Sequence, residues 1–337
     1  MEWQIKIRKI IENIENIPDG DPKFEDKRYK AYSISENNFH EFFLDEKVNI
    51  CAIDGGNAEV FFRPELSIHF VRIYFNLFNV KRLGPSKKFE YYVVAYACGE
   101  GGKITYKTET IPLNSNLCLK NLSFDSYDER LRRGEFRAEI SLVPKIIRKF
   151  LEWLVVKEAV KVVGSGDIIL KDGSLQTGYP YESVFAKEAW NIAKNKVRLM
   201  ALSKRSNLYT TTGKNLSDVL FKMGEKILRQ KMYYYYPIVE IEHPDHQAKM
   251  LFVKLHQHAE RLFRLEIHNS LEIDNTILSS LAANSKDPRF LGYPYPLIEA
   301  DRVARISERE RLHHKNLLSS LFSSKKDPHE ILDMLFR

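Results

Sequence analysis

A long helix and a short strand follow one another in the sequences Pro144-Lys-Ile-Ile-Arg-Lys-Phe-Leu-Glu-Trp-Leu-Val-Val-Lys-Glu-Ala-Val-Lys-Val-Val-Gly164 and Asp167-Ile-Ile-Leu-Lys-Asp172-Gly-Ser174. Proline suits the first turn of a helix and glycine its end, so the first sequence predicts a helix over residues 145–163. Apolar residues surround most of this helix, which must therefore be buried against a sheet. The apolar run after it, closed by Asp-Gly, predicts a buried strand and its exit turn.

A second apolar run of the same kind lies upstream, in the sequence Asn49-Ile-Cys-Ala-Ile-Asp54-Gly-Gly56. It also predicts a buried strand that ends in an acid and a turn. Strand-like segments at hairpin spacing come next, over residues 59–63, 67–76 and 89–97. Residues 99–130 are polar and predict irregular structure. Hairpin strands, then a helix, then another strand indicate the α/β class, with a mixed sheet and helices on its faces.

The remaining residues divide around this core. An amphipathic helix, a polar stretch and a short helix near residues 37–44 make up an N-terminal helical segment over 1–47. The core itself is expected over 48–205. Alternating apolar patterns predict a further group of strands in an α+β insertion over 206–285. The last segment, 286–337, is expected to complete the core and to carry a long C-terminal helix that ends near Phe322.

The composition favours a globular protein of the cytoplasm. Of 337 residues, 44% are hydrophobic and 29% are charged, and no apolar run is long enough to span a membrane. The three cysteines lie far apart without a CxxC pair, which suits a reducing compartment. The net charge of +7 is compatible with a polyanionic partner, although many proteins without such a partner are equally basic.

Two aspartates, Asp54 and Asp172, stand at the predicted ends of the two buried strands, and a glycine follows each. A carboxylate in this position points into the crevice beyond the strand, and the glycine lets a phosphate or a water molecule approach closely. Two such strands side by side would place hard oxygen ligands around Mg²⁺ or Mn²⁺. The alternative at each position is a plain Asp-Gly turn.

Glu152 is the third candidate because it lies on an apolar face of the predicted buried helix. An unpaired buried charge is costly, and a bound metal ion would compensate it. The alternative is an ion pair with Arg148, one helical turn earlier. Glu158 lies on the same helix and remains a rival, since spacing alone does not separate the two.

Four sequences resemble, in order, the successive motifs of the NurA family of nucleases: Ala52-Ile-Asp54-Gly55, Ile168-Ile-Leu-Lys-Asp172-Gly-Ser-Leu175, Ala201-Leu-Ser-Lys204-Arg-Ser206 and Gly292-Tyr-Pro-Tyr-Pro-Leu-Ile-Glu-Ala-Asp301. The resemblance covers residues 49–307. It implies a ribonuclease H-like core, a homodimer, and Mn²⁺-dependent cleavage of DNA as a single-stranded endonuclease and 5′-to-3′ exonuclease. It also implies a role in DNA end resection and double-strand-break repair with the hexameric translocase HerA.

The resemblance also assigns roles to single residues. Asp54 and Asp172 match the acids of the first two motifs, and Glu152 matches a helix glutamate that follows an arginine by four residues. These three acids are the predicted catalytic residues, and the resemblance implies that they and Asp301 hold two Mn²⁺ or Mg²⁺ ions. Family members often carry histidine where this chain has Asp301, so Glu299 or a water molecule stays open as the fourth ligand.

Predicted DNA contacts come from the same comparison and from charge. Lys204 matches a lysine that follows a strand in the family and is a plausible phosphate contact. For Tyr293, packing in the core is the alternative to lining the DNA path, since stacking on bases needs an exposed ring. The full set of predicted DNA contacts is Arg148, Lys204, Arg205, Tyr293 and Arg302.

The expected chemistry is hydrolysis with two cations about 3.5–4 Å apart, one activating water and one stabilising the departing 3′-oxygen. One rival hypothesis is a catalytically silent subunit of the same fold that only binds DNA or docks the motor. The presence of all three principal acids favours the enzyme. A nuclease for RNA or RNA–DNA hybrids is a third hypothesis, because a fold does not set its substrate.

Overall fold

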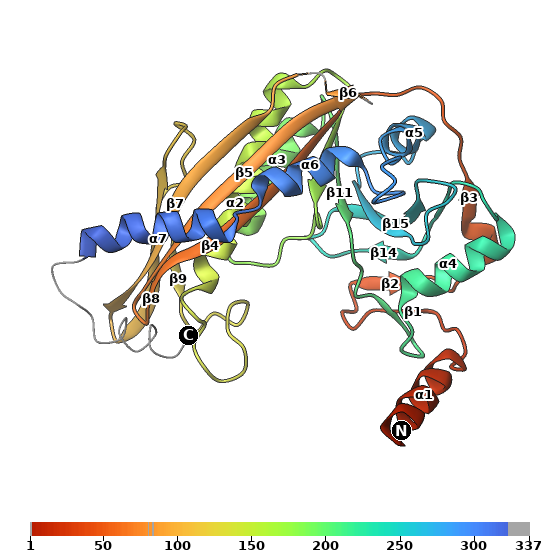
Figure 1. The fold of residues 1–337 in the computed structure, drawn as a ribbon, viewed down its shortest axis with the longest axis horizontal. Coiled ribbons are helices and arrows are strands. Elements are labelled where there is room, and N and C mark those ends of the chain that lie inside the picture. The colour runs from red at the N-terminus through yellow and green to blue at the C-terminus, as the bar shows by residue number, and fades with distance from the viewer. Residues whose placement is uncertain (1, 80, 83, 323–337) are drawn as a thin grey trace.

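The computed structural model describes residues 2–79, 81–82 and 84–322, and the rest of the predicted last segment, 323–337, lies outside them. Twelve strands of the described chain form one sheet (Figure 1). Only the pairs β4–β10 and β10–β11 are parallel. The spatial order is β3 (Phe39–Glu41), β13 (Tyr233–Tyr235), β15 (Ala248–Lys254), β16 (Phe263–His268), β11 (Arg198–Ser203), β10 (Ile168–Asp172), β4 (Ile50–Arg63), β5 (Leu66–Asn79), β7 (Lys87–Glu100), β8 (Lys103–Pro112) and β9 (Ser123–Asp125), with β6 (Lys81–Arg82) on β5.

Helices cover both faces of the sheet, which confirms the predicted mixed α/β architecture. One apolar core joins the sheet to α2 (Leu142–Val162) and α3 (Glu182–Ala193). A second core, on the other face, joins it to α5 (Asn275–Ala283) and α6 (Tyr295–Ala304). In Figure 1, α6 and α7 (Glu308–Phe322) cross the long strands on the side opposite α2. The predicted buried helix over 145–163 corresponds to α2 and is confirmed.

Strand β4 does not end at Asp54, and this corrects the predicted turn at Asp54-Gly-Gly. The strand continues to Arg63 in antiparallel pairing with β5. The two glycines serve close packing instead of a turn. A Cβ atom on Gly55 would lie 2.7 Å from the Oε1 atom of Glu152, and one on Gly56 would overlap the carbonyl oxygen of Ala304. Glycine here lets α2 and α6 approach the strand from its two sides.

Three other predicted elements are also corrected. Residues 99–130 contain β8 and β9, because threonines and a tyrosine alternate toward the buried face of β8 and suit a pleated strand. The short helix near 37–44 is a 3₁₀ turn, Glu36–Asn38, followed by strand β3, which pairs with β13. The long C-terminal helix is two helices, since α6 ends at Ala304 and α7 begins at Glu308.

Residues 206–285, expected as an insertion, continue the main sheet through β16, which pairs with β11. They also contain α4 (Leu216–Ile227) and β14 (Val239–Ile241). Two small sheets join this part to the N-terminal segment: β1 (Pro22–Lys23) with β12 (Tyr209–Thr210), and β2 (Tyr29–Ala31) with β14.

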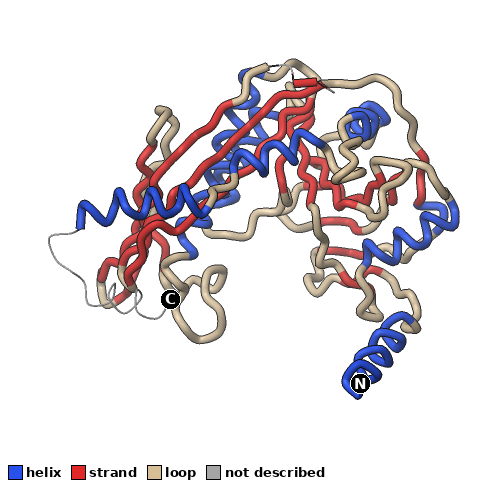
Figure 2. The backbone as a smooth tube through the Cα atoms, viewed as in Figure 1, coloured by secondary structure: helices blue, strands red, loops and turns tan. Residues whose placement is uncertain are grey.

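Helix α1 (Glu2–Glu15) stands apart from the rest of the fold (Figure 2), and none of its residues is buried. Most of its apolar side chains, such as Trp3 and Ile10, are more than half exposed. Within the described part of the chain, no helix has the length and apolar character needed to cross a membrane.

Candidate active site

Asp54 and Asp172 lie next to each other on two parallel strands. The register pairs Ile50 with Ile168 and ends with Ile53 opposite Lys171, so each aspartate is the next residue of its strand. Strand β10 ends at Asp172, as predicted, and Gly173 turns the chain away with a φ of +95°. The Asp54 side chain is buried, within a strand that continues past it.

Neither carboxylate has a cationic side chain as an ion-pair partner within residues 2–79, 81–82 and 84–322. Asp54 accepts a hydrogen bond from the backbone N–H of Gly55 at 2.7 Å, and Asp172 accepts one from the Tyr293 hydroxyl at 2.9 Å. Burial, followed by repulsion from Asp172 and Glu152, raises the pKa of Asp54 to about 7. Burial also raises the pKa of Asp172, although Lys204 and the Tyr293 hydroxyl oppose the rise. When the two carboxyl groups are ionised, no cationic side chain of the described residues is paired with their negative charge.

Glu152 lies on the opposite side of the strands. Ile53 and Ile169 pack in the core with α2, whereas Ala52 and Leu170 pack in the core with α6. Because strand side chains alternate between faces, Lys171 points toward α2 while Asp54 and Asp172 belong to the α6 face.

Two cations hold the Glu152 carboxylate. Its Oε1 atom pairs with Arg148, and its Oε2 atom lies 2.5 Å from Lys171 Nζ. Burial opposes ionisation of Glu152, but Lys171 and Arg148 outweigh it and lower its pKa. The expected ion pair with Arg148 is present, and Arg148 also donates to the carbonyl of Gly55 at 2.6 Å. Glu158 instead pairs with Lys161 at 2.6 Å, so Glu152 is the glutamate of α2 that lies near Asp54.

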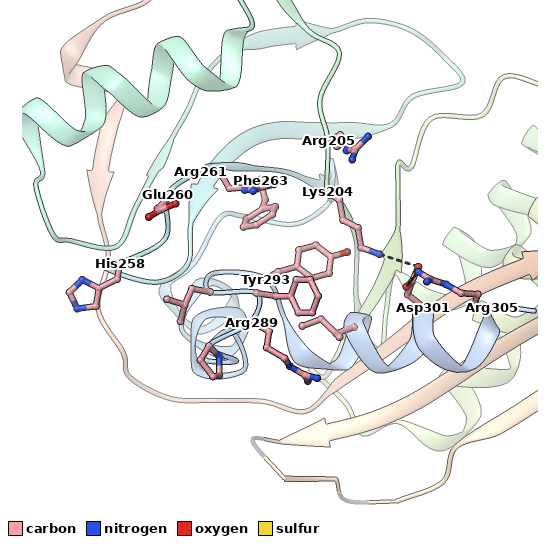
Figure 3. A pocket seen from close by; sticks show the side chains of 14 residues that line it. Lys204, Arg205, His258, Glu260, Arg261, Phe263, Arg289, Tyr293, Asp301 and Arg305 are labelled. Carbon is pink, nitrogen blue, oxygen red and sulfur yellow. Dashed lines mark hydrogen bonds and ion pairs between the residues drawn. The ribbon is translucent and has the colours of Figure 1, made fainter. Parts of the chain in front are cut away.

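Asp301 lies on α6 and is held by two cations. Its Oδ1 atom is 3.2 Å from Lys204 Nζ, and its Oδ2 atom is 2.9 Å from Arg305 Nη2 (Figure 3). Lys204 also lies over the Tyr293 ring, 5.3 Å from its centre. Glu299, the other candidate for the fourth ligand, accepts a hydrogen bond from the Asn76 side chain at 2.8 Å. Glu299 is thus engaged in packing α6 on β5.

Tyr293 connects this group to the aspartate pair. Its ring is 4% exposed, which leaves little surface for stacking on a base, while its hydroxyl donates to Asp172. Tyr293 therefore packs in the core, as one of the two alternatives expected, and its hydroxyl also reaches the candidate site. The tyrosine orients Asp172.

The donor chemistry of Asp54 and Asp172 fits a hard cation such as Mg²⁺ or Mn²⁺. Two carboxylates that repel each other, one buried and one half-buried, with one hydrogen-bond donor apiece, gain most from a bound positive charge. Glu152 and Asp301 are less available, since cations already pair with both. In the described part of the chain, no group of three or more acidic, histidine or cysteine side chains is arranged to hold an ion.

A cavity of about 920 Å³ opens beside Tyr293 (Figure 3). Three of the predicted DNA contacts, Lys204, Arg205 and Tyr293, line it. The other two do not: Arg148 is bound to Glu152 on the α2 side, and Arg302 is exposed on α6. The cavity is bordered by five basic and two acidic side chains, namely Lys204, Arg205, Arg261, Arg289, Arg305, Glu260 and Asp301.

Glu266, on β16, is a site residue that the sequence analysis missed. It is fully buried and accepts hydrogen bonds from the Ser174 hydroxyl and the Leu175 N–H, both at 2.7 Å. Its carboxylate lies 3.2 Å from both His246 and Arg264. Burial opposes its charge, but His246 and Arg264 outweigh burial and lower its pKa to about 2.

Glu266 therefore fixes the turn that follows Asp172. Ser203 supports the same turn by donating to the Gly173 carbonyl at 2.6 Å. A charged residue within the apolar strand Phe263-Arg-Leu-Glu-Ile-His268 was the available signal. Such a glutamate must be paired when the strand is buried on both faces.

Comparison with known proteins adds a family and a fold. The NurA domain model matches residues 48–306. The crystal structure of the NurA nuclease from Sulfolobus solfataricus is similar, with a TM-score of 0.55, 16% identity, and 96% of each chain covered. An Argonaute structure from Aquifex aeolicus has a TM-score of 0.32 and 10% identity, covering 77% of this chain and 28% of its own. No curated protein sequence matches the chain.

Proposed function

The chain belongs to the NurA family, and from this premise we propose that it is a divalent-metal-dependent nuclease that cleaves DNA on a ribonuclease H-like core. The observation that carries the proposal is the pair Asp54 and Asp172 on adjacent parallel strands, one buried and one half-buried, neither paired with a cation of the described residues. The solved protein of this fold from Sulfolobus solfataricus is named a nuclease, which supports the same conclusion.

The proposed cofactor is Mn²⁺ or Mg²⁺, as two ions, with Asp54 and Asp172 as the principal ligands. Bound there, such ions supply activation of water and neutralisation of charge on the phosphate. Glu152 and Asp301 remain proposed ligands. For either to bind an ion, its carboxylate must exchange a lysine or arginine partner for the ion.

The side chains around the pair have separate proposed tasks. Tyr293 holds the orientation of Asp172 through its hydroxyl. Lys204 and Arg205 contact phosphates from the wall of the cavity, and Arg302 does so from the exposed face of α6. Arg148, which binds Glu152 and the carbonyl of Gly55, acts on DNA indirectly by fixing the strand at Asp54.

The wider role is proposed from family membership. We propose single-stranded endonuclease and 5′-to-3′ exonuclease activities, in DNA end resection during double-strand-break repair in the cytoplasm. The proposed assembly is a homodimer that works with a HerA-type translocase on single- and double-stranded DNA ends.

One observation favours a second candidate function. Two of the four predicted ligands are engaged in ion pairs, and the described residues contain no three-membered ligand cluster. These features suit a catalytically silent subunit that binds DNA or docks the motor. The same experiment separates the two functions.

The experiment measures degradation of end-labelled single- and double-stranded DNA with Mn²⁺, Mg²⁺ or EDTA, with and without a translocase. Asp54→Asn and Asp172→Asn should lose metal-dependent cleavage, because each removes a charged ligand while keeping the shape of the side chain. Asp45→Asn, an exposed aspartate with no contact to the site, is the matched control and should cleave normally. A folded wild-type protein that is inert under every condition would establish the silent subunit instead.

A further inference from the structure

A groove leads away from the candidate active site. The cavity beside Tyr293 and Asp301 adjoins a second cavity of about 390 Å³ that reaches the start of α4 at Asn215 and Ser217. The two cavities share Lys204, Arg205, Glu260 and Arg261 along their borders. Because they share these residues, the two cavities lie next to each other, and we call them together the groove; the first one borders Tyr293 and Asp301, which are bound to Asp172 and Lys204.

Two arginines at the junction carry charges that the described part of the chain does not pair. Lys204 and Arg305 are bound to Asp301, and Arg289 is bound to Asp287 at 2.9 Å. Arg205 and Arg261 border both cavities, are exposed, and make no ion pair with a described acid. Glu260 is the one acid at this junction, so positive charge prevails there. Unpaired guanidinium groups of this kind bind phosphate oxygens in a bidentate manner.

An exposed aromatic ring borders the first cavity. Phe290 is 52% exposed, in contrast to Phe263 and Tyr293 in the same wall, which are buried. A large apolar ring left in water beside arginines is the arrangement by which proteins stack the bases of an unpaired strand. The ring is too exposed to contribute much to the core.

The first cavity has room for unpaired nucleotides. About 920 Å³ is the volume of a pocket for a drug-sized ligand, or roughly one or two nucleotides. A duplex would present its bases stacked inside, out of reach of Phe290. The groove therefore suits nucleotides that have left the duplex.

We propose that this groove binds a stretch of single-stranded DNA next to the scissile phosphate, with Arg205 and Arg261 on its phosphates and Phe290 against one of its bases. The inference rests on the proposed nuclease function and adds where the substrate strand lies. It makes Arg261 and Phe290 specificity residues for unpaired DNA, and it gives residues 258–263 a part in substrate binding.

The test is binding of a labelled oligothymidylate in EDTA, measured by fluorescence anisotropy over a range of salt concentrations. The double variant Arg205→Gln/Arg261→Gln should bind more weakly and lower the slope of log affinity against log salt by about 1.4, because each phosphate contact on a single strand contributes about 0.7. Phe290→Leu should weaken binding by roughly 5-fold to 100-fold with the salt slope unchanged, since it removes stacking and no charge.

Arg133→Gln, an exposed arginine between β9 and α2, is the matched control and should bind as the wild type does. With a blunt duplex of the same length, Phe290→Leu should change binding by less than about two-fold, because the bases of a duplex stay stacked inside it and do not reach Phe290. The proposal is overturned if the wild type does not bind the oligothymidylate, if the Arg and Phe variants bind it normally, or if the duplex shows equal losses.

Binding in EDTA keeps this inference separate from the proposed function. If the wild type cleaves DNA but the groove variants bind the oligothymidylate normally, the inference about the groove is wrong and the proposed nuclease function stands. If the variants show the expected binding pattern but the wild type cleaves no DNA, the proposed nuclease function is wrong and the inference about the groove stands.

Discussion

Asp54 lowers the stability of the metal-free protein once it is ionised. Burial and the adjacent Asp172 raise its pKa from an ordinary value of 3.8 to about 7. Between these two pH values the folded state holds a proton that the unfolded chain has lost. The free energy of unfolding should therefore fall as pH rises from about 4 to about 7, by at most about 4 kcal/mol, and then stay level.

We expect Asp54→Asn to be more stable than the wild type at pH 8 in EDTA, because asparagine cannot ionise. The difference should shrink at pH 5, where the wild-type carboxyl is still protonated in the folded state. Urea unfolding at both pH values measures it. Adding Mn²⁺ at pH 8 should reverse the order, since only the wild type gains from the ion. A variant that is less stable than the wild type at pH 8 without metal would contradict this account of the site.

Glu152 has a structural effect that can be measured apart from catalysis. Glu152→Gln leaves Lys171, whose side chain is 6% exposed, without its carboxylate. Breaking one partner of a buried pair costs about 3–5 kcal/mol. Glu158→Gln, on the same helix, breaks a more exposed pair and should cost less than about 1 kcal/mol. Chemical denaturation of both variants measures the loss in free energy of unfolding. Equal losses would show that the ion pair with Lys171 does not account for the effect of Glu152.

The choice between Glu152 and Glu158 shows what residue spacing contains and what it lacks. Helical periodicity placed both on α2 but did not say which one faces the strands that carry Asp54 and Asp172. That depends on Lys171, whose direction follows from the alternation of β10 and from its register with β4. Such information belongs to long-range pairing, so spacing alone did not separate the two glutamates, and the choice of Glu152 came from the family resemblance.

At the scale of elements, strand β16 positions the turn after β10 through Glu266. Glu266→Gln keeps the size of the side chain but loses the charge that holds Arg264 and His246. We expect the Mn²⁺ concentration for half-maximal cleavage to rise about 10- to 100-fold, as it does when a residue that supports a metal ligand is changed. Glu240→Gln, exposed on β14, is the matched control.

The metal titration distinguishes positioning from loss of fold. A merely structural defect would lower the amount of active protein and leave the half-maximal Mn²⁺ concentration unchanged. An unchanged midpoint in a folded Glu266→Gln protein would remove the positioning role.

The sequence predicted a strand end correctly where the backbone conformation of one residue determines it, and wrongly where the packing of distant helices determines it. Strand β10 ends at Asp172 because Gly173 adopts a positive φ, which an Asp-Gly sequence announces. At Asp54 the Asp-Gly sequence led to a wrong prediction of a strand end, because Gly55 and Gly56 make room for α2 and α6 within a continuous strand. The two functions of glycine, turning and close approach, have the same sequence pattern, and only the arrangement of distant helices separates them.

At the scale of the whole molecule, one sheet contains strands of both the predicted core over 48–205 and the predicted insertion over 206–285. Strand β11 pairs with β10 on one side and with β16 on the other. Leu202 of β11 and Leu265 of β16 lie in the same buried core. The predicted insertion over 206–285 therefore shares both hydrogen bonds and apolar contacts with the predicted core over 48–205.

This continuity predicts that the two parts unfold together. Trp153 on α2 and Trp190 on α3 are buried and report on the core, and the Trp190 ring also lies 5.5 Å from that of His268 on β16. Leu265→Ala should destabilise the protein by about 2–5 kcal/mol. If unfolding is cooperative, its urea midpoint shifts equally by tryptophan fluorescence and by far-ultraviolet circular dichroism. A variant whose tryptophan transition stays at the wild-type midpoint, while circular dichroism shows an earlier step, would mean that residues 206–285 unfold as a separate unit despite the shared sheet.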